Sequence, residues 1–286
     1  MSDQAKKLRQ MLHHHDKKAK TISVVSGKGG VGKSNTSLNF ALQLLQLDFK
    51  VLLIDLDIGM GNIDILVGND ANYSIANLFN DYSPINDIIE LGPNNLNYIA
   101  GGTSLEEIVH LRNEQLQFFF DEMEKAVQLY DYILFDLGAG VSEAALSFIL
   151  ASDECIVLTT PEPTAITDAY SMMKHIIQRN NALPMNVLIN RCKNEREGKQ
   201  TMMKFTKVIK HFLQKEVKPI GILPEDSIVT TAVIKQVPYT ILNQHASISK
   251  AMKTIVESYV TGDKVDSLLE ERGSFILRLK KMFGKG

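Results

Sequence analysis

Residues 27–34 read G-K-G-G-V-G-K-S, which fits the phosphate-binding loop pattern G-x-x-x-x-G-K-[ST]. A β-branched and apolar run at 21–25 precedes this loop, and apolar residues at helical spacing follow it. In a strand–loop–helix unit the glycines let backbone N–H groups turn toward phosphate oxygens, and the helix N-terminus adds partial positive charge. The pattern therefore predicts a phosphate site at the start of a helix.

The side chains of this loop suit a nucleoside triphosphate with Mg²⁺. We expect Lys33 to reach the β- and γ-phosphates and the Ser34 hydroxyl to ligate Mg²⁺. The alternative is a glycine turn without a ligand, but a Lys and a Ser after the last Gly have no packing purpose. The predicted nucleotide-binding residues of the loop are Gly27, Lys28, Gly29, Gly30, Val31, Gly32, Lys33, Ser34 and Asn35.

Length and composition indicate one large domain or two small ones, and the cysteines suggest a cytoplasmic protein. The chain has 286 residues, 44% of them hydrophobic, and a formal net charge of −2. This balance disfavours a whole-surface nucleic-acid binder, so we expect no nucleic-acid partner. No run of eighteen apolar residues and no secretory signal is present. Cys155 and Cys192 fall on separate predicted strands and suggest buried thiols in a reducing compartment.

Short apolar runs alternate with helical patterns along most of the chain. Strands are predicted over 22–26, 51–55, 96–99, 132–136, 155–159, 186–190 and 219–223, and helices over 33–46, 113–129, 142–150, 164–179, 200–213, 227–234 and 246–260. Near-continuous apolar strands are typical of a sheet buried on both faces. We therefore predict an α/β fold with a mostly parallel sheet and helices on both faces. The predicted divisions are a basic leader (1–20), the main domain (21–262) and a linker with a terminal helix (263–286).

Carboxylates end two of the predicted strands. Asp136 follows four bulky residues and precedes Gly138, a pattern typical of a Walker B strand that holds Mg²⁺ directly or through water. Asp55 and Asp57 end an earlier strand and project the same way from an extended backbone. We expect Asp55 to support the metal site, although two strand-capping acids are the alternative.

The second loop lysine makes the chain resemble a known family. The pattern K-G-G-x-G-K-[ST], which includes Lys28, resembles the deviant Walker A loop of the class that contains MinD, ParA, nitrogenase reductase and the arsenite ATPase. The resemblance implies that Lys28 crosses the interface of an ATP-dependent homodimer and touches the partner's nucleotide. Residues 55–64 resemble the switch I of MinD-type ATPases, which implies that Asp57 positions the attacking water. Lys28, Lys33 and Asp57 are thus the predicted catalytic residues.

Adenine is favoured as the base. The guanine-reading N-K-x-D motif is not matched, because Asn190 is followed by Arg-Cys-Lys without an Asp in register. Residues 224–226 resemble the P-E-D loop beside adenine in MinD. The predicted base contacts are Asn190, Pro224, Glu225 and Asp226, with ATP and ADP as the nucleotides. Glu162 and Asp168 occupy a loop that lines the dimer face in this family. Two interpretations are equally favoured: these acids pair across the dimer face, or they are simply acids at the start of a helix.

The last predicted helix is amphipathic and basic. Phe275, Ile276, Leu279, Met282 and Phe283 share one face at 100° per residue, and Arg278 and Lys280 flank it. Such a helix resembles the membrane-targeting sequence of MinD and would bind anionic lipid reversibly at the cytoplasmic face of the membrane. The alternative is that it docks on the protein's own core.

The leader D-Q-A-x-x-L-R resembles the activator helix of the FlhG (FleN, YlxH) family of flagellar-number regulators. The resemblance implies that Gln4, Leu8 and Arg9 stimulate the GTPase FlhF, and that flagellar C-ring (switch) proteins are partners. A division-site ATPase of the MinD type or a partitioning ATPase of the ParA type is the alternative. An iron–sulfur carrier is disfavoured because Cys155 and Cys192 are far apart in sequence.

Overall fold

The computed structural model describes residues 18–57, 63–102, 108, 110–140, 142–266 and 274–284. In this part of the chain eight strands form one sheet in the order β3-β4-β2-β5-β1-β6-β7-β8. All neighbouring strands are parallel except β3 and β4. The strands are β1 (Lys20–Val25), β2 (Val51–Leu56), β3 (Glu90–Leu91), β4 (Asn97–Ile99), β5 (Tyr132–Leu137), β6 (Glu154–Thr159), β7 (Met185–Cys192) and β8 (Lys218–Pro224).

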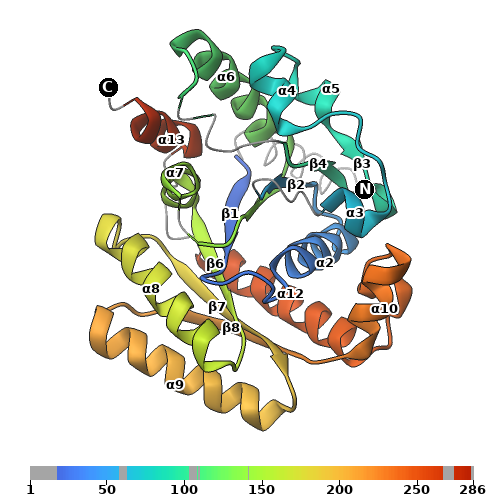
Figure 1. Ribbon diagram of the computed structural model, residues 1–286, viewed down its shortest axis with the longest axis vertical. Helices are drawn as coiled ribbons and strands as arrows, with labels where there is room; N and C mark the ends of the chain where they lie inside the picture. Colours follow the sequence, from blue (N-terminus) through green and yellow to red (C-terminus); the bar gives the residue numbers. More distant parts are fainter. Residues whose placement is uncertain are drawn as a thin grey trace, which may run out of the picture.

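Helices cover both faces of this sheet (Figure 1). One core cluster joins the sheet to α2 and α12, and the other joins it to α6, α7, α8, α9 and α13. The helices are α2 (Lys33–Gln46), α3 (Ile63–Val67), α4 (Ile75–Asn80), α5 (Ile85–Ile88), α6 (Asn113–Leu129), α7 (Glu143–Ala151), α8 (Pro163–Arg179), α9 (Glu195–Leu213), α10 (Ser227–Lys235), α11 (Tyr239–Leu242), α12 (Ser247–Asp266) and α13 (Phe275–Phe283).

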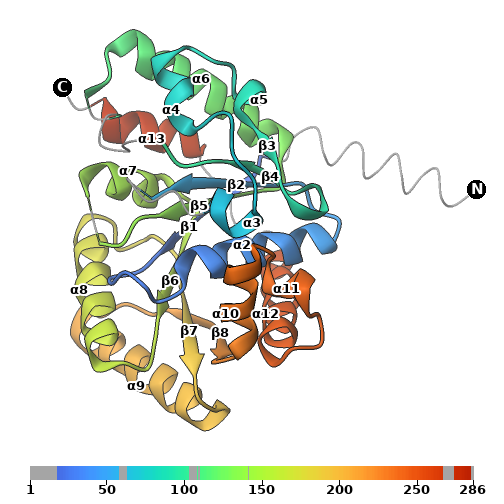
Figure 2. The same cartoon turned by 45° about the vertical axis from the view of Figure 1, so that its right-hand side comes forward.

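The topology places ligand-binding loops at one edge of the sheet. β1 lies between β5 and β6, so the crossovers that leave β1 and its neighbours diverge to the two sides. Figure 2 shows α2 following β1 on one face while α8 covers the other. In parallel α/β sheets, ligands bind outside the carboxyl ends of the strands where the connections diverge. The loop after β1 lies at such a point.

The predicted α/β class with a mostly parallel sheet is confirmed. β3 and the short helices α3, α4, α5 and α11 were not predicted, because two to six residues are too few to show a periodicity. α9 begins at Glu195 rather than at 200, since the Asn194 side chain accepts from the Glu197 N–H at 2.9 Å and caps the helix earlier. The predicted divisions near residues 20 and 262 stay predictions, and α12 runs past the second, to Asp266.

Two sequence features lie outside the described residues. These are the leader residues Gln4, Leu8 and Arg9, and the middle half of the segment that resembles switch I, 58–62. Within the described ranges, none of the helices combines the length and the apolar character needed to cross a bilayer.

Candidate functional site

The phosphate loop connects β1 to α2 through two glycines in the left-handed region. Gly30 has φ 77° and Gly32 has φ 93°, a conformation that side-chain-bearing residues rarely adopt. A Cβ on Gly32 would also lie 2.5 Å from the Asn190 side-chain nitrogen. The glycine at 32 therefore lets the start of α2 approach the end of β7, where that asparagine sits.

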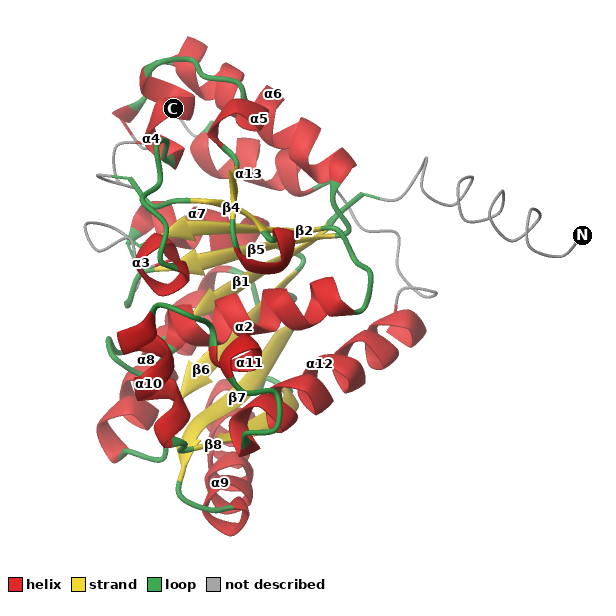
Figure 3. Ribbon diagram, turned by 90° about the vertical axis from the view of Figure 1, so that its right-hand side faces the viewer, coloured by secondary structure: helices red, strands yellow, loops and turns green. Residues whose placement is uncertain are grey.

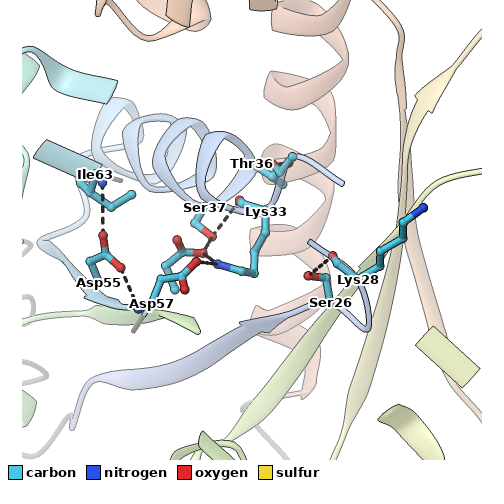
Figure 4. Close-up of polar contacts among 10 residues, drawn as sticks. Ser26, Lys28, Lys33, Thr36, Ser37, Asp55, Asp57 and Ile63 are labelled. Carbon is cyan, nitrogen blue, oxygen red and sulfur yellow. Dashed lines mark hydrogen bonds and ion pairs between the residues drawn. The ribbon is translucent and has the colours of Figure 1, made fainter. Parts of the chain in front are cut away.

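Lys33, the first residue of α2, lies between two carboxylates. Its ammonium is 2.9 Å from Asp136 Oδ1 and 3.7 Å from Asp57 Oδ2 (Figure 4). Ser37, one turn later on α2, donates from its hydroxyl to the same Oδ1 of Asp136 at 2.8 Å. Asp136 and Ser37 are fully buried, so Lys33 and Ser37 together fix the orientation of this carboxylate. The structure thus brings Lys33, Asp57 and Asp136 together, while the roles that the sequence assigns to them stay predictions.

The remaining oxygen of Asp136 suits a hard cation. Oδ2 is buried and accepts no hydrogen bond from the described part of the protein, which is costly for a carboxylate unless another ligand uses it. Magnesium prefers carboxylate and hydroxyl oxygens of this kind. Ser34 lies half-buried beside Lys33 at the start of α2. These residues therefore fit Mg²⁺ bound together with phosphate.

Asp57 lies in an environment that disfavours its charge. Burial raises the pKa of the Asp57 carboxyl above its usual range, and the neighbouring Asp136 raises it further, while Lys33 opposes both effects. Such a carboxyl is a better proton acceptor than a solvated aspartate.

Both carboxylate oxygens of Asp55 accept hydrogen bonds from the backbone. One of its oxygens accepts the N–H of Asp57 at 2.9 Å, and the other accepts the N–H of Ile63 at 3.2 Å. Figure 4 shows its carboxylate directed at these two amides. In this arrangement Asp55 anchors the backbone at Asp57 and at Ile63, and its support of the metal site stays a prediction.

Lys28 points away from the Lys33 cluster (Figure 4). Its ammonium is 3.2 Å from Glu162 and 3.1 Å from the Thr164 hydroxyl, both at the start of α8 in the same chain. Of the two acids Glu162 and Asp168, Glu162 is thus the one that pairs with Lys28. The backbone of Asp168 lies close to the phosphate loop, since a Cβ on Gly27 would be 2.2 Å from the Asp168 carbonyl carbon.

A cavity of about 680 Å³ opens beside the loop. Asn190 lines it and donates from Nδ2 to the Val31 carbonyl at 2.8 Å, which leaves its buried Oδ1 without a partner among the described residues. The other lining residues include Gly32, Asn35, Thr36, Arg191, Pro224, Glu225, Asp226, Val229, Val233, Ile234 and Tyr239.

Asp226 lines this cavity but its carboxylate has another use. Oδ1 accepts from the Ile228 N–H at 3.1 Å and caps α10, while Oδ2 accepts from the Ser247 hydroxyl at 2.7 Å. Asp226 therefore helps to shape the wall of the cavity, and its contact with the base stays a prediction.

The C-terminal helix α13 docks on the body, which was the alternative to a lipid-bound helix. Figure 3 shows it next to α6 and near α7. Phe275, Ile276 and Leu279 are buried there, and Phe283 packs near Phe148 with ring centroids 6.2 Å apart. Three of the five residues on the face predicted to bind lipid are therefore buried, while Met282 and Phe283 are partly buried against the same core.

A polar contact accompanies this docking. The Arg278 guanidinium donates to Asp153 Oδ1 at 2.6 Å and to the Ala151 carbonyl at 2.7 Å. Asp153 in turn accepts from Thr21. No sequence pattern indicates this contact, because its partners are more than a hundred residues apart.

The two cysteines are buried, as predicted, and lie near opposite ends of their strands. Cys155 is the second residue of β6 and Cys192 the last of β7. Burial raises the pKa of both thiols, that of Cys192 to about 11.

Comparisons with known proteins identify the family. The model for ParA, described as an NUBPL iron-transfer P-loop NTPase, matches residues 17–260. The antiactivator FleN of Pseudomonas aeruginosa is 32% identical over 229 residues, covering 80% of this chain and 81% of FleN. The flagellum site-determining protein YlxH of Helicobacter pylori is 31% identical over 301 residues, covering 99% and 100%.

A solved structure agrees at the level of the fold. The septum site-determining protein MinD of Pyrococcus horikoshii, complexed with Mg-ADP, superposes with a TM-score of 0.69 at 23% identity, covering 89% of this chain and all of that one. The family match runs from ahead of β1 into α12, and so includes the phosphate loop and both carboxylates that face Lys33. The chain therefore belongs to the ParA/MinD family of P-loop NTPases.

Proposed function

We propose that this protein is an ATPase that dimerises with ATP, associates reversibly with the membrane and regulates the placement and number of flagella. The observation that carries the hydrolytic part is the cluster of Lys33, Asp57, Asp136 and Ser37 at the carboxyl edge of the sheet. FleN and YlxH support the flagellar part by their similarity over most of the chain.

The cluster suits phosphoryl transfer to water. Lys33 binds the phosphates, while Ser34 and Asp136 Oδ2 would hold Mg²⁺, which when bound would supply positive charge beside the phosphates. Asp57, held near the same lysine, orients the attacking water. Its raised pKa suits a group that accepts a hydrogen bond and then a proton.

The cavity supports adenine as the base. Asn190 uses its amide nitrogen on the Val31 carbonyl, so its oxygen is the group left for a ligand. An acceptor pairs with the exocyclic amine of adenine and repels the carbonyl that guanine carries at the equivalent position. Pro224 and Glu225 provide further wall contacts at this site.

Dimerisation is proposed through Lys28. In the single chain its ammonium pairs with Glu162, and both side chains are well exposed, so the pair is easily exchanged. Lys28→Ala should leave ADP binding intact and abolish the dimer with a non-hydrolysable ATP analogue, measured by light scattering. Lys18→Ala is the matched control, since Lys18 forms a similar exposed pair with Glu124 at 3.2 Å. A dimer formed by the Lys28 variant would refute this role.

Membrane association is proposed through α13. Because Phe275, Ile276 and Leu279 are buried on the body, lipid binding requires the helix to leave that site first. Deletion of 274–286 should release the protein from anionic liposomes and leave dimerisation unchanged. Unchanged co-sedimentation after this deletion would refute the anchor.

The leader is proposed to stimulate the GTPase FlhF through Gln4, Leu8 and Arg9, with flagellar C-ring proteins as further partners. A peptide of residues 1–20 should raise the GTP hydrolysis rate of FlhF, and the same peptide with Gln4→Ala and Arg9→Ala should not. If neither peptide acts, a MinD-like or ParA-like role is favoured, in keeping with the MinD fold. Iron transfer is not proposed, because the two buried cysteines lie near opposite ends of their strands.

A further inference from the structure

Arg191 has an unusual backbone for its residue type. Its φ is 57°, in the left-handed region that residues with long side chains rarely adopt. It lies where the register between β7 and β8 shifts between Ile189 and Cys192, which is a bulge in the ladder. Bulges near active sites commonly redirect a side chain out of the sheet.

The neighbouring contacts hold this conformation in place. On one side Asn190 is tied to the phosphate loop through the Val31 carbonyl at 2.8 Å. On the other side the Cys192 carbonyl accepts the Glu225 N–H at 2.8 Å. The strained residue is thus fixed between the phosphate loop and the 224–226 loop, which are the two loops that border the cavity.

Arg191 borders two cavities. It lines the large cavity beside α10, and it also lines a smaller one, of about 190 Å³, with Lys28, Gly29, Gly30 and Glu162. Its guanidinium forms no hydrogen bond or ion pair with any residue in the described ranges. Arg179 and Arg278, by contrast, are each paired with a carboxylate.

The chemistry of the large cavity indicates what this cation meets. Helix α10 contributes apolar side chains to the lining, namely Val229, Val233 and Ile234. A flat purine placed against such a wall still has a second ring face to cover. Guanidinium groups are planar, weakly hydrated and stack well on aromatic faces.

We propose that Arg191 stacks on the purine ring of the nucleotide bound by the same chain. This inference rests on the proposed binding of ATP and ADP in the cavity and adds to it a contact that fixes the base by its face. Stacking does not distinguish adenine from guanine, so Asn190 sets the choice of base while Arg191 adds affinity for either purine.

The experiment compares three variants by calorimetry with ADP, which keeps the contacts of an ATP-driven dimer out of the measurement. Arg191→Asn removes the guanidinium and keeps a residue type that tolerates positive φ. Arg191→Lys keeps the charge without the planar group. Lys193→Asn is the matched control, since Lys193 is exposed two residues away and lines neither cavity. Inorganic tripolyphosphate, which has no base, is titrated in parallel.

We expect Arg191→Asn to weaken ADP binding ~2- to 30-fold, as the usual range of cation–π energies implies, and to leave tripolyphosphate binding unchanged. Arg191→Lys should recover only part of this loss, and Lys193→Asn should bind as the wild type does. Equal losses for ADP and tripolyphosphate, with full recovery in Arg191→Lys, would show a phosphate contact and overturn the stacking. Unchanged ADP binding in Arg191→Asn would also overturn it. Wild-type protein that binds no purine nucleotide would instead refute the proposed function.

Discussion

Phe120 on α6 gives a way to loosen the C-terminal helix without changing that helix. Its ring centroid is 6.4 Å from that of Phe283, and the Lys280 ammonium lies 5.5 Å from the centre of the same ring. An aromatic pair contributes ~0.5–1.5 kcal/mol and an exposed cation–π contact ~0.5–1 kcal/mol. Phe120→Ala should therefore weaken docking by about 1–2.5 kcal/mol, which lowers the ratio of docked to free helix ~5- to 70-fold.

Hydrogen exchange of residues 275–283 with ADP present measures this ratio directly. The matched control is Phe118→Ala, because Phe118 lies on the same helix but pairs with Tyr82 at 5.3 Å. We expect faster exchange in α13 for Phe120→Ala alone, and with it more co-sedimentation with anionic vesicles. Wild-type protection in Phe120→Ala, or an equal loss in both variants, would refute a specific contribution of this ring.

Three further predictions concern the site. Asp57→Ala should bind ATP yet hydrolyse it at least ~100-fold more slowly. In the wild type the Asp57 carboxyl must be ionised to act, and its pKa is raised. The kcat/KM of the wild type should therefore begin to fall on acidification at a pH above the usual aspartate range. Ser37→Ala should raise the Mg²⁺ concentration for half-maximal hydrolysis ~10- to 100-fold, since Asp136 loses a hydrogen bond that orients it; an unchanged Mg²⁺ titration would contradict this. The Cys192 thiol has a pKa of about 11, so at pH 8 it should react with a disulfide reagent at least ~100-fold more slowly in the folded protein than in denaturant. Rapid labelling of the folded protein would show that the thiol is not buried.

The sheet and the phosphate loop could be predicted because their signals are local. An apolar run followed by G-K-G-G-V-G-K-S specifies a strand, a turn and a helix within some twenty residues, and parallel pairing then brings Asp136 to the same edge. Contacts that depend on folded distance could not be predicted. From the sequence alone, Ser37 cannot be told apart from a serine on the surface of a helix. Arg278 contacts Asp153 only because α13 folds back on α7.

The side-chain uses of the predicted acids show the same limit. Asp55 is expected to support the metal site and Asp226 to lie beside the base, and the structure shows what their carboxylates bind: Asp55 holds the backbone after β2, and Asp226 caps α10. A sequence shows the residue type at a strand end, but a carboxylate accepts from whichever donor the local backbone presents. Neighbouring N–H groups at a helix start are always available, so such acids often serve the scaffold.

The two loop lysines have a common feature that links binding to signalling. Lys33 pairs with Asp136 and Asp57, and Lys28 pairs with Glu162, so carboxylates of the same chain already neutralise both cations. If the loop binds phosphate as proposed, the phosphate competes with Asp136 for Lys33, and the carboxylate that loses this partner is then better suited to Mg²⁺. Loss of the buried partner of Lys33 without a replacement is costly, whereas the exposed pair of Lys28 with Glu162 contributes little. In the proposed dimer, this difference leads us to expect that a second chain recruits Lys28 at little cost, after the first chain has bound its nucleotide.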